Sequence, residues 1–315
     1  MRESEIVELL RQVATGGAAR GLADDAAVWS PPLGRELVLT HDIVAAGVHY
    51  LPGDDPSDIA WKLVAVNLSD LAAKGAVPAG VLLGLSLGDE DEAWLRRFAG
   101  GLHRVLSDHG TALWGGDTVR SGGQASLGCT AVGHVLPGSA LARAGGRDGD
   151  LLFVTGTIGD AGLGLAARRG EAPGDAYLER RYRLPMPRLG FGKRLAESGA
   201  HAAMDVSDGL LIDAARMAAA SGLAAEIDCK AVPLSQAAAA RLPAGDTGRL
   251  AAARAGDDYE ILLAAPAQAE AALRAAAATD ALPLTRIGRL RLGAGLCVLG
   301  TEGRAIDPGP LGYEH

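Results

Sequence analysis

Six aspartates stand next to apolar segments of this sequence, and carboxylates in such places indicate chemistry. They are Asp25, Asp42, Asp70, Asp117, Asp205 and Asp208. Asp70 is the most unusual of them, because it lies with Asn67 and Ser69 inside the Ala- and Leu-rich run 65–76. A carboxylate among apolar side chains is costly unless a positive group compensates it. We therefore expect the six aspartates to share one site that supplies positive charge.

Magnesium is the cation that suits such a set. Clustered carboxylates repel one another, and a hard cation that prefers oxygen ligands removes the repulsion. Mg²⁺ binds a few carboxylates and leaves its other positions to phosphate and water, which predicts a metal that bridges a polyphosphate. For each aspartate by itself the alternative is a turn, since Asp favours turns. That alternative is weakest for Asp70, within a predicted helix, and for Asp205, at the end of an apolar strand.

Phosphate-binding patterns are present only in part. The sequence has no G-x-x-x-x-G-K-[ST] loop. Gly115-Gly116 before Asp117 would let backbone N–H groups approach phosphate oxygens, and a tight turn is the alternative. The run 162–167 matches G-x-G-x-x-A, but no acidic residue closes a second strand about 20 positions later, so close helix packing explains it better. Arg143 would either neutralise phosphate or lie in solvent.

Few other side chains indicate a site. His49 stands among apolar neighbours on a predicted strand, either as a ligand-binding residue or as a half-buried structural histidine. Lys74 is expected to pair with Asp70 at i, i+4 on one helix face. The sequence shows no Ser/His/Asp or Cys/His arrangement, and its three cysteines, which lack metal-type spacing, are expected to be reduced and structural.

Short strands and helices alternate along the chain and must position these residues. Periodicity and capping signals predict helices over 3–14, 55–73, 90–109 and 207–220, the last with Ser207 as its N-cap. Strands are predicted over 26–29, 36–40, 81–87, 111–114, 125–135, 151–155, 202–206 and 260–263. The helix 55–73 carries Asn67 and Asp70 on one face. Such alternation indicates an α/β or α+β fold.

Length and composition fit a two-domain globular protein. The chain has 315 residues, of which 48% are apolar and 22% charged. A linker over 137–150 places the boundary between domains 1–137 and 138–315. The net charge of −8 argues against a nucleic-acid or anionic-membrane surface. Because the N-terminus is acidic and no apolar run approaches about 18 residues, we expect a cytoplasmic protein without signal peptide or membrane span.

In order along the chain, these segments resemble the thiamine-monophosphate kinase family, which belongs to the ATP-dependent superfamily of aminoimidazole ribonucleotide synthetase. The matching segments are DDAAV (24–28), THD (40–42), AGVHY (46–50), VNLSDLAA (66–73), GGDT (115–118), TGTIGD (155–160), PR (187–188), DVSDGL (205–210) and GDDYE (256–260). The resemblance implies two α/β domains in the aminoimidazole ribonucleotide synthetase-like fold. It also implies a homodimer, in which domain 1–137 binds ATP and Mg²⁺ and pairs into a β-barrel-like core, while 138–315 completes the active site.

The resemblance further implies ATP-dependent phosphorylation of thiamine phosphate to thiamine diphosphate with several Mg²⁺ ions. It places the metals at Asp25, Thr40, His41, Asp42, Asp70, Asp117, Asp205 and Asp208, and catalysis at Asp70, Asp117 and Asp208. It places ATP at Gly116, Asp117, Arg143 and Ser207. It places the thiamine moiety, whose cationic ring suits acidic and aromatic neighbours, at His49, Asp257 and Tyr313. Since a phosphate nucleophile is already ionised, direct in-line attack requires positioning and charge neutralisation rather than a strong general base.

Four residues depart from the family pattern, and two alternative functions stay open. Ala23, His41, Lys74 and Asp257 stand where the family usually has Gly, Thr or Ser, Met and Glu. None of these changes removes a metal-binding aspartate, although Asp257 shortens the reach to substrate by one methylene. The first alternative is another enzyme of the superfamily that uses ATP on a different acceptor. The second is a non-catalytic protein that binds a nucleotide or thiamine phosphate.

Overall fold

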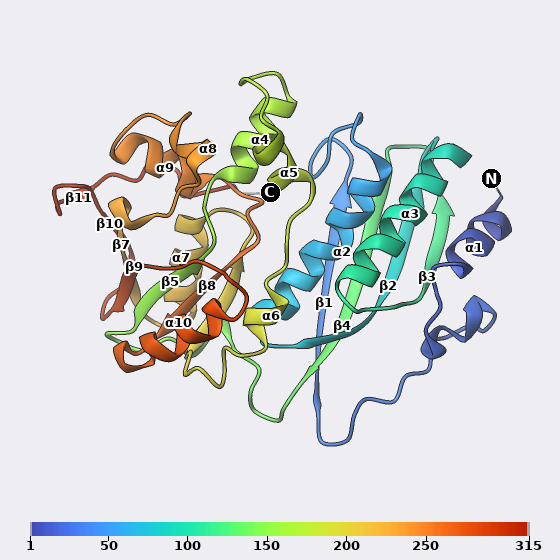
Figure 1. The fold of residues 1–315 in the computed structure, drawn as a ribbon, viewed down its shortest axis with the longest axis horizontal. Helices are drawn as coiled ribbons and strands as arrows, with labels where there is room; N and C mark the ends of the chain where they lie inside the picture. The colour runs from blue at the N-terminus through green and yellow to red at the C-terminus, as the bar shows by residue number, and fades with distance from the viewer. Residues whose placement is uncertain (1, 314–315) are drawn as a thin grey trace. The chain divides into compact units, whose positions relative to one another are not determined.

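The computed structural model describes residues 2–313, which divide into two compact units (Figure 1). Unit 1 comprises the residues up to Leu71 together with Ala76–Gly138, and unit 2 comprises Ala72–Gly75 together with the residues from Ser139 onward. Each unit contains one sheet with both parallel and antiparallel pairs. Within residues 2–313, no helix combines the length and apolarity that crossing a membrane requires.

Unit 1 is a four-stranded sheet with helices on one face. Its strands are β1 (Glu36–Ala45), β2 (Val77–Leu87), β3 (Leu113–Arg120) and β4 (Ser126–Val135), and its helices are α1 (Glu3–Arg11), η1 (Gly17–Leu22), α2 (Pro56–Ala73) and α3 (Glu92–Asp108). The strand order is β1-β4-β2-β3, so β1 and β3 are the edges. Strand β4 is antiparallel to β1 and β2, and β2 is parallel to β3. Helices α2 and α3 lie across the sheet (Figure 1).

The two faces of this sheet differ in burial. Along β2, Val81, Leu83 and Leu85 are buried, whereas the alternating Leu82 and Gly84 are exposed. Because side chains alternate across a strand, one face packs against the helices and the other faces outward. We call the outward side the open face. It carries five large apolar side chains that are 37–62% exposed: Leu37, Leu39, Ile43, Leu82 and Val119.

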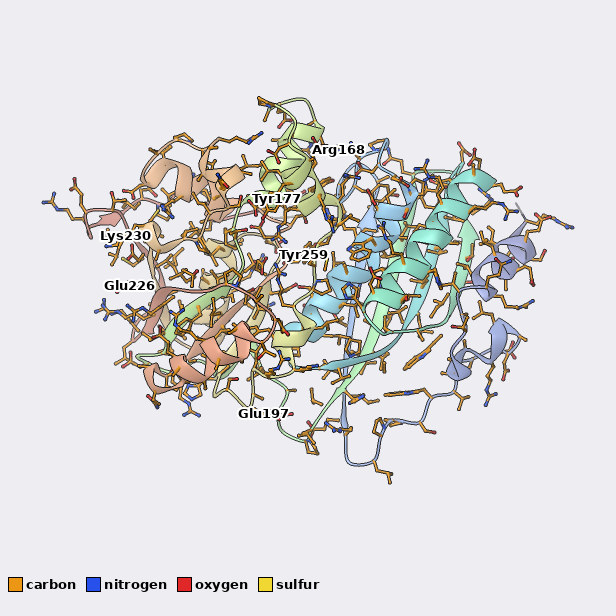
Figure 2. All side chains as sticks on the ribbon, viewed as in Figure 1. Arg168, Tyr177, Glu197, Glu226, Lys230 and Tyr259 are labelled. Carbon is orange, nitrogen blue, oxygen red and sulfur yellow. The ribbon has the colours of Figure 1, made fainter. Side chains whose placement is uncertain are left out.

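Unit 2 is a seven-stranded sheet in the order β11-β10-β7-β9-β5-β8-β6. Its strands are β5 (Leu151–Thr155), β6 (Ala202–Val206), β7 (Ala224–Asp228), β8 (Glu260–Ala265), β9 (Leu284–Arg291), β10 (Gly295–Leu299) and β11 (Ala305–Ile306). Only the β7–β10 pair is parallel among the described strands of this sheet. Glu226 of β7, labelled in Figure 2, accepts a hydrogen bond at 2.7 Å from its register partner Arg289 of β9.

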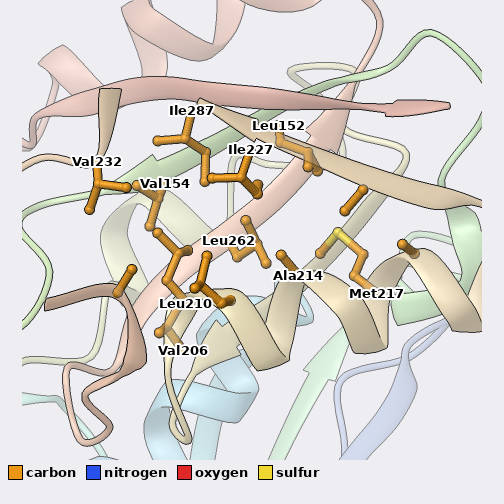
Figure 3. Close-up of a cluster of buried hydrophobic side chains, with 14 of the residues drawn as sticks. Leu152, Val154, Val206, Leu210, Ala214, Met217, Ile227, Val232, Leu262 and Ile287 are labelled. Atoms are coloured by element: carbon orange, nitrogen blue, oxygen red, sulfur yellow. The ribbon is translucent and has the colours of Figure 1, made fainter. Parts of the chain in front are cut away.

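Helices cover both faces of the unit 2 sheet. They are η2 (Arg143–Gly145), α4 (Asp160–Arg168), α5 (Ala176–Arg183), α6 (Leu189–Gly192), α7 (Leu210–Ala220), η3 (Cys229–Ala231), α8 (Gln236–Ala239), α9 (Asp246–Arg254), η4 (Ala267–Ala269) and α10 (Glu270–Ala278). On one face, Leu152 and Val154 of β5 pack with Met217 of α7 (Figure 3). On the other, Phe153 packs with Leu273 of α10. The uninterrupted apolar sequence of residues 151–154 in β5 agrees with burial on both sides.

Most predicted elements are confirmed, with shifts at their ends that matter for the site. The strand predicted over 36–40 runs to Ala45, and the strand predicted over 111–114 runs from Leu113 to Arg120. Asp42 and Asp117 therefore lie inside strands, and not at their carboxyl ends as expected. The reason is that neither the polar residues nor the Gly pair interrupts the sheet hydrogen bonds of β1 and β3.

Three local predictions were wrong. Segment 26–29 is irregular, and Trp29 packs against Trp114 with ring centroids 5.0 Å apart instead of joining a sheet. Ser207 does not cap α7, which begins at Leu210 after Gly209, a residue with φ of 131° that suits glycine. His49 lies in a turn after β1 and not on a strand. In each case tertiary contacts or a loop conformation override the local pattern.

Gly101 of α3 allows α3 to approach α2 closely, because a Cβ built there would lie 2.2 Å from the carbonyl oxygen of Ser57. We expect Gly101→Ala to force the helices apart and to lower the free energy of unfolding by about 1–3 kcal/mol. Gly100→Ala is the matched control, since a Cβ at Gly100 meets no atom within 4 Å. Its helix propensity is expected to raise stability by up to about 1 kcal/mol. Denaturant unfolding measures both, and equal effects would contradict this packing.

Candidate active site

Helix α2 and strand β1 bring predicted metal-binding residues together in unit 1. Thr40 donates a hydrogen bond from Oγ1 to Oδ2 of Asp70 at 2.5 Å. The backbone N–H of Asp42 donates to Oδ1 of Asn67 at 3.0 Å. Thr40 and Asp42 are two residues apart on β1, so both side chains lie on the face that α2 covers. Thr40 and Asp42 of β1 thus lie beside Asp70 on the predicted polar face of α2. Asp42 and Asp70 are only partly buried.

Asn67 has a structural role that the sequence did not reveal. Its side chain is fully buried, and Nδ2 donates to the carbonyl of Leu63 at 2.9 Å while Oδ1 accepts from Asp42. A buried amide must find partners, and here these partners join the helix that carries Asp70 to the strand that carries Asp42. The sequence feature that could have indicated this role is the amide of Asn67, which stands one turn before Asp70 in a mostly apolar helix.

His41 lies on the other side of β1. Its Nδ1 is 2.9 Å from Oγ1 of Thr130, its register partner on β4, and the side chain is exposed on the open face. Period-two alternation places this imidazole away from Asp42 and Asp70. The imidazole therefore does not lie with the two carboxylates, and a metal contact from His41 stays a prediction.

Gly116 and Asp117 lie on β3, at the opposite edge of the sheet from Asp42. A Cβ at Gly116 would lie 2.1 Å from the carbonyl oxygen of Leu83, so this close approach requires glycine. The register runs from Asp42 through Cys129 and Leu83 to Gly116, which is three strand spacings or about 14 Å. Since ligands of one Mg²⁺ lie within about 4 Å of one another, this separation does not allow Asp42 and Asp117 of one chain to share one ion.

Asp25 and His49 lie in irregular segments of unit 1. Asp25 is exposed after η1, and its N–H donates to Oδ1 of Asp24 at 2.9 Å. His49 is half-buried, and its Nδ1 accepts from the N–H of Ala45 at 3.2 Å. Its carbonyl accepts a 2.8 Å hydrogen bond from Nζ of Lys62, whose side chain is buried. The His49 turn is thus anchored to α2 through a buried lysine.

In unit 2, the loop after β6 is held by α7. The N–H groups of Ser207 and Asp208 both donate to Oδ2 of Asp213 at 3.1 Å. Arg216 donates from Nη1 to Oδ1 of Asp213 at 3.0 Å and also pairs with Asp208. Burial raises the pKa of Asp213 to about 6. Sequence reasoning missed Asp213 and Arg216, although they stand one turn apart on the helix that follows the DVSDGL segment.

Three predicted sets of residues meet around this loop. Asp205 is buried at the end of β6. The N–H of Asp257 donates to the carbonyl of Ser207 at 2.8 Å, and the N–H of Tyr313 donates to the carbonyl of Asp208 at 2.9 Å. Residues predicted for ATP, for metal and for the thiamine moiety are therefore contiguous along backbone hydrogen bonds within unit 2.

Two basic residues behave differently from the carboxylates. Arg143 lies exposed in η2, which packs against β6 and α7. Lys74 donates from Nζ to the carbonyl of Ala203 at 2.9 Å, and its pairing with Asp70 stays a prediction. The run 162–167 lies within α4, where a Cβ at Gly164 would be 2.1 Å from the carbonyl oxygen of Leu178, which supports close helix packing over a dinucleotide site.

The donor set fits magnesium. Among residues 2–313, no three or more His, Cys, Asp and Glu side chains are grouped so that they would hold a metal ion. The six aspartates are divided between the units, with Asp25, Asp42, Asp70 and Asp117 in unit 1 and Asp205 and Asp208 in unit 2. All predicted side-chain donors except His41 are oxygen atoms, which Mg²⁺ prefers.

The variant Asp213→Asn tests the electrostatics of the loop after β6. A carboxyl whose pKa rises from 3.8 to about 6 on folding contributes most to stability below pH 4, and this contribution is lost as pH rises through 6. We expect the free energy of unfolding of the wild type, relative to Asp213→Asn, to fall by about 3 kcal/mol between about pH 3.5 and 7. Denaturant unfolding across this range measures the difference, and a pH-independent difference would contradict the assignment.

Comparison with known proteins identifies the family. Residues 23–135 match the family described as AIR synthase related protein, N-terminal domain, and residues 147–295 match AIR synthase related protein, C-terminal domain. The thiamine-monophosphate kinase of Caulobacter vibrioides is 40% identical to this chain over 316 residues, which cover 98% of this chain and 89% of that protein.

Two of the solved structures that are similar to this one match it over nearly their full length. The thiamine-monophosphate kinase from Stenotrophomonas maltophilia K279a is 40% identical, covers 96% of each chain and has a TM-score of 0.84. A structure of AaThiL complexed with AMPPCP and TMP is 28% identical, covers 100% of this chain and 99% of that chain, and has a TM-score of 0.79. With its two-domain α/β fold and two mixed sheets, this chain belongs to the thiamine-monophosphate kinase family of AIR synthase related proteins.

Proposed function

We propose that this chain catalyses the ATP-dependent phosphorylation of thiamine phosphate to thiamine diphosphate. The observation that carries the proposal is the contiguity of Ser207, Asp208, Asp257 and Tyr313 in unit 2, through backbone hydrogen bonds of 2.8 and 2.9 Å. The resemblance assigns these four residues to ATP, metal and the thiamine moiety. The relative from Caulobacter vibrioides and the AaThiL complex with AMPPCP and TMP support the same reaction.

The carboxylates would hold several Mg²⁺ ions, which supply positive charge to the transferring phosphoryl group. In unit 1 the metal ligands would come from Asp25, Asp42, Asp70 and Asp117, with Thr40 hydrogen-bonded to Asp70 and His41 as a further ligand. In unit 2 they would come from Asp205 and Asp208. Of these, Asp70, Asp117 and Asp208 would act closest to the reacting groups.

The remaining residues would bind and orient the two substrates. Gly116 would expose its backbone to phosphate. Ser207 lies in a loop in which its N–H group donates to Asp213, and the exposed Arg143 would neutralise phosphate charge. His49, Asp257 and Tyr313 would contact the cationic thiamine moiety. Because the acceptor phosphate is already ionised, the residues need only align it with ATP for direct in-line transfer.

The two domains would divide this work. Domain 1–137 would carry the ATP- and magnesium-binding residues and form the dimer contact, and domain 138–315 would complete the active site. The open face supports the first assignment, because several large apolar side chains exposed on one sheet face mark an interaction surface. A second copy of the same sheet is the occupant that also covers the edge strands β1 and β3, which gives the β-barrel-like core of a homodimer.

Incubation of the pure protein with ATP, Mg²⁺ and thiamine phosphate tests the function directly. We expect thiamine diphosphate and ADP, and we expect Asp70→Asn to lower turnover by at least about 100-fold because one carboxylate at the metals is lost. Circular dichroism of the variant checks that it folds. Binding of both ligands without turnover would favour the non-catalytic alternative, and turnover of another phosphate acceptor alone would favour a different enzyme of the superfamily.

Leu39→Asp tests the dimer. Leu39 is 62% exposed on the open face, so a carboxylate there is expected to convert the dimer into a monomer in sedimentation velocity. Leu33→Asp is the matched control, because Leu33 is fully exposed before β1 and lies outside the sheet. A Leu39→Asp protein that remains dimeric, or a wild type that is monomeric, would count against this interface.

A further inference from the structure

The turn 256–259, which carries Asp257, has a strained backbone. Asp257 has φ of 70° and Tyr259 has φ of 50°, in the region that side chains other than glycine rarely adopt. Such conformations persist only where the surrounding structure holds them, and they concentrate at ligand-binding sites. The intrinsic backbone preference of Asp257 therefore does not explain its conformation. The tertiary contacts of the neighbouring residues Asp258 and Glu260 do.

Asp258, in the centre of the turn, is anchored at the start of α4. Its side chain is buried, Oδ2 accepts from the N–H of Gly159 at 2.6 Å, and Oδ1 accepts from the N–H of Ala161 at 3.2 Å. These two bonds satisfy helix N–H groups that have no partner within α4. They fix the middle of the turn to α4, whereas other groups fix the end of the turn that leads into β8.

Glu260, the first residue of β8, is fully buried and binds two arginines. Arg188 makes a two-pronged contact, with Nε donating to Oε2 at 2.7 Å and Nη2 donating to Oε1. Arg181 donates from Nη2 to Oε1 at 2.8 Å and also to the backbone carbonyl of Asp258 at 3.3 Å. Thr155 donates to Oε2 at 2.7 Å. Arg181 therefore ties the carboxylate of Glu260 to the backbone of the strained turn.

The charged cluster around Glu260 also contains Asp160, so the two carboxylates of Asp160 and Glu260 lie beside the two guanidinium groups of Arg181 and Arg188. Nε of Arg181 lies 3.6 Å from Oδ2 of the buried Asp160, which also accepts a 3.0 Å hydrogen bond from the hydroxyl of Tyr177 on α5 (labelled in Figure 2). Buried ion pairs seldom stabilise a fold more than apolar side chains of the same size would. A cluster of this kind is better explained by the single conformation that it imposes on the turn.

We propose that Arg181 and Arg188 are positioning residues for the phosphate acceptor, which hold Asp257 in its strained conformation through Glu260 and the carbonyl of Asp258. This inference rests on the proposed function, in which Asp257 contacts the thiamine moiety. The side chains of Arg181 and Arg188 are 11% and 22% exposed and their guanidinium groups bind Glu260, so they act through the turn and not on the substrate. Their effect falls on acceptor binding, because Asp257 is the residue of the turn that is assigned to the acceptor.

The variants Arg181→Lys and Arg188→Lys test the proposal. Lysine keeps a positive charge beside Glu260 but lacks the planar fork that makes two contacts at once. We expect the dissociation constant of thiamine phosphate, measured by calorimetry, and its KM to rise by about ten-fold or more, because small displacements of a positioning group have large effects. The dissociation constant of a non-hydrolysable ATP analogue is expected to stay within about two-fold of the wild type. Should Arg181→Lys fail to fold, Arg188→Lys carries the same test.

Two controls separate positioning from general stability. Arg194→Lys is the matched control, since Arg194 pairs with Asp280 at 2.8 Å in the same unit and contacts neither Glu260 nor the turn in any described hydrogen bond. It is expected to leave both affinities unchanged. In a double-mutant cycle, Arg181→Lys added to Asp257→Ala is expected to weaken acceptor binding no further than Asp257→Ala alone.

The outcomes distinguish the inference from the function on which it rests. Additive effects in the cycle, equal losses for both ligands, or acceptor affinities in both lysine variants that match the wild type would overturn the positioning role. A wild-type protein that neither binds nor phosphorylates thiamine phosphate would instead overturn the proposed function, whatever the arginine variants do.

Discussion

Fully buried carboxylates at strand ends and helix starts are the constraint on which unit 2 depends. Asp213, Asp258 and Glu260 are 0–1% exposed, and each would be costly without hydrogen-bond donors or cations. Asp213 receives the N–H groups of Ser207 and Asp208, Asp258 receives those at the start of α4, and Glu260 receives two guanidinium groups. The partners of Asp258 and Glu260 lie far away in the sequence, so satisfying these two carboxylates fixes how their elements pack, whereas the partners of Asp213 are only five and six residues from it.

The carboxylates assigned to metal are satisfied differently. Asp42 and Asp70 are only partly buried; the carboxylate of Asp70 accepts from the neutral hydroxyl of Thr40, and the backbone N–H of Asp42 donates to Asn67. Asp117 is exposed on an edge strand. The fully buried carboxylates are thus matched by donors of the chain itself, whereas Asp42, Asp70 and Asp117 keep part of their surface exposed. Asp208 stands between these classes, because Arg216 pairs with it and leaves it partly exposed.

Much of the fold could be predicted because strong periodicity reflects burial. Helix α2 and strands β5, β6 and β8 are mostly apolar and were found with nearly correct ends. The errors fall where local signals compete with long-range contacts. Trp29 packs on Trp114 in place of strand pairing, and the glycine at 209 starts α7 later than the hydroxyl of Ser207 suggested. Local preference is a weak term, and tertiary packing overrides it.

The sequence by itself determined the family, the two-domain organisation that the family implies, and the residue types of the site, because motif order and apolar periodicity are properties of the chain. Tertiary structure alone decided which face of β1 carries Asp42 and which carries His41, and that Asp42 and Asp117 lie on opposite edges of a sheet. It also decided that Arg181 and Arg188 meet at Glu260. The physical reason is that strand alternation, register and buried charge pairing join residues whose separation in sequence carries no signal of their contact.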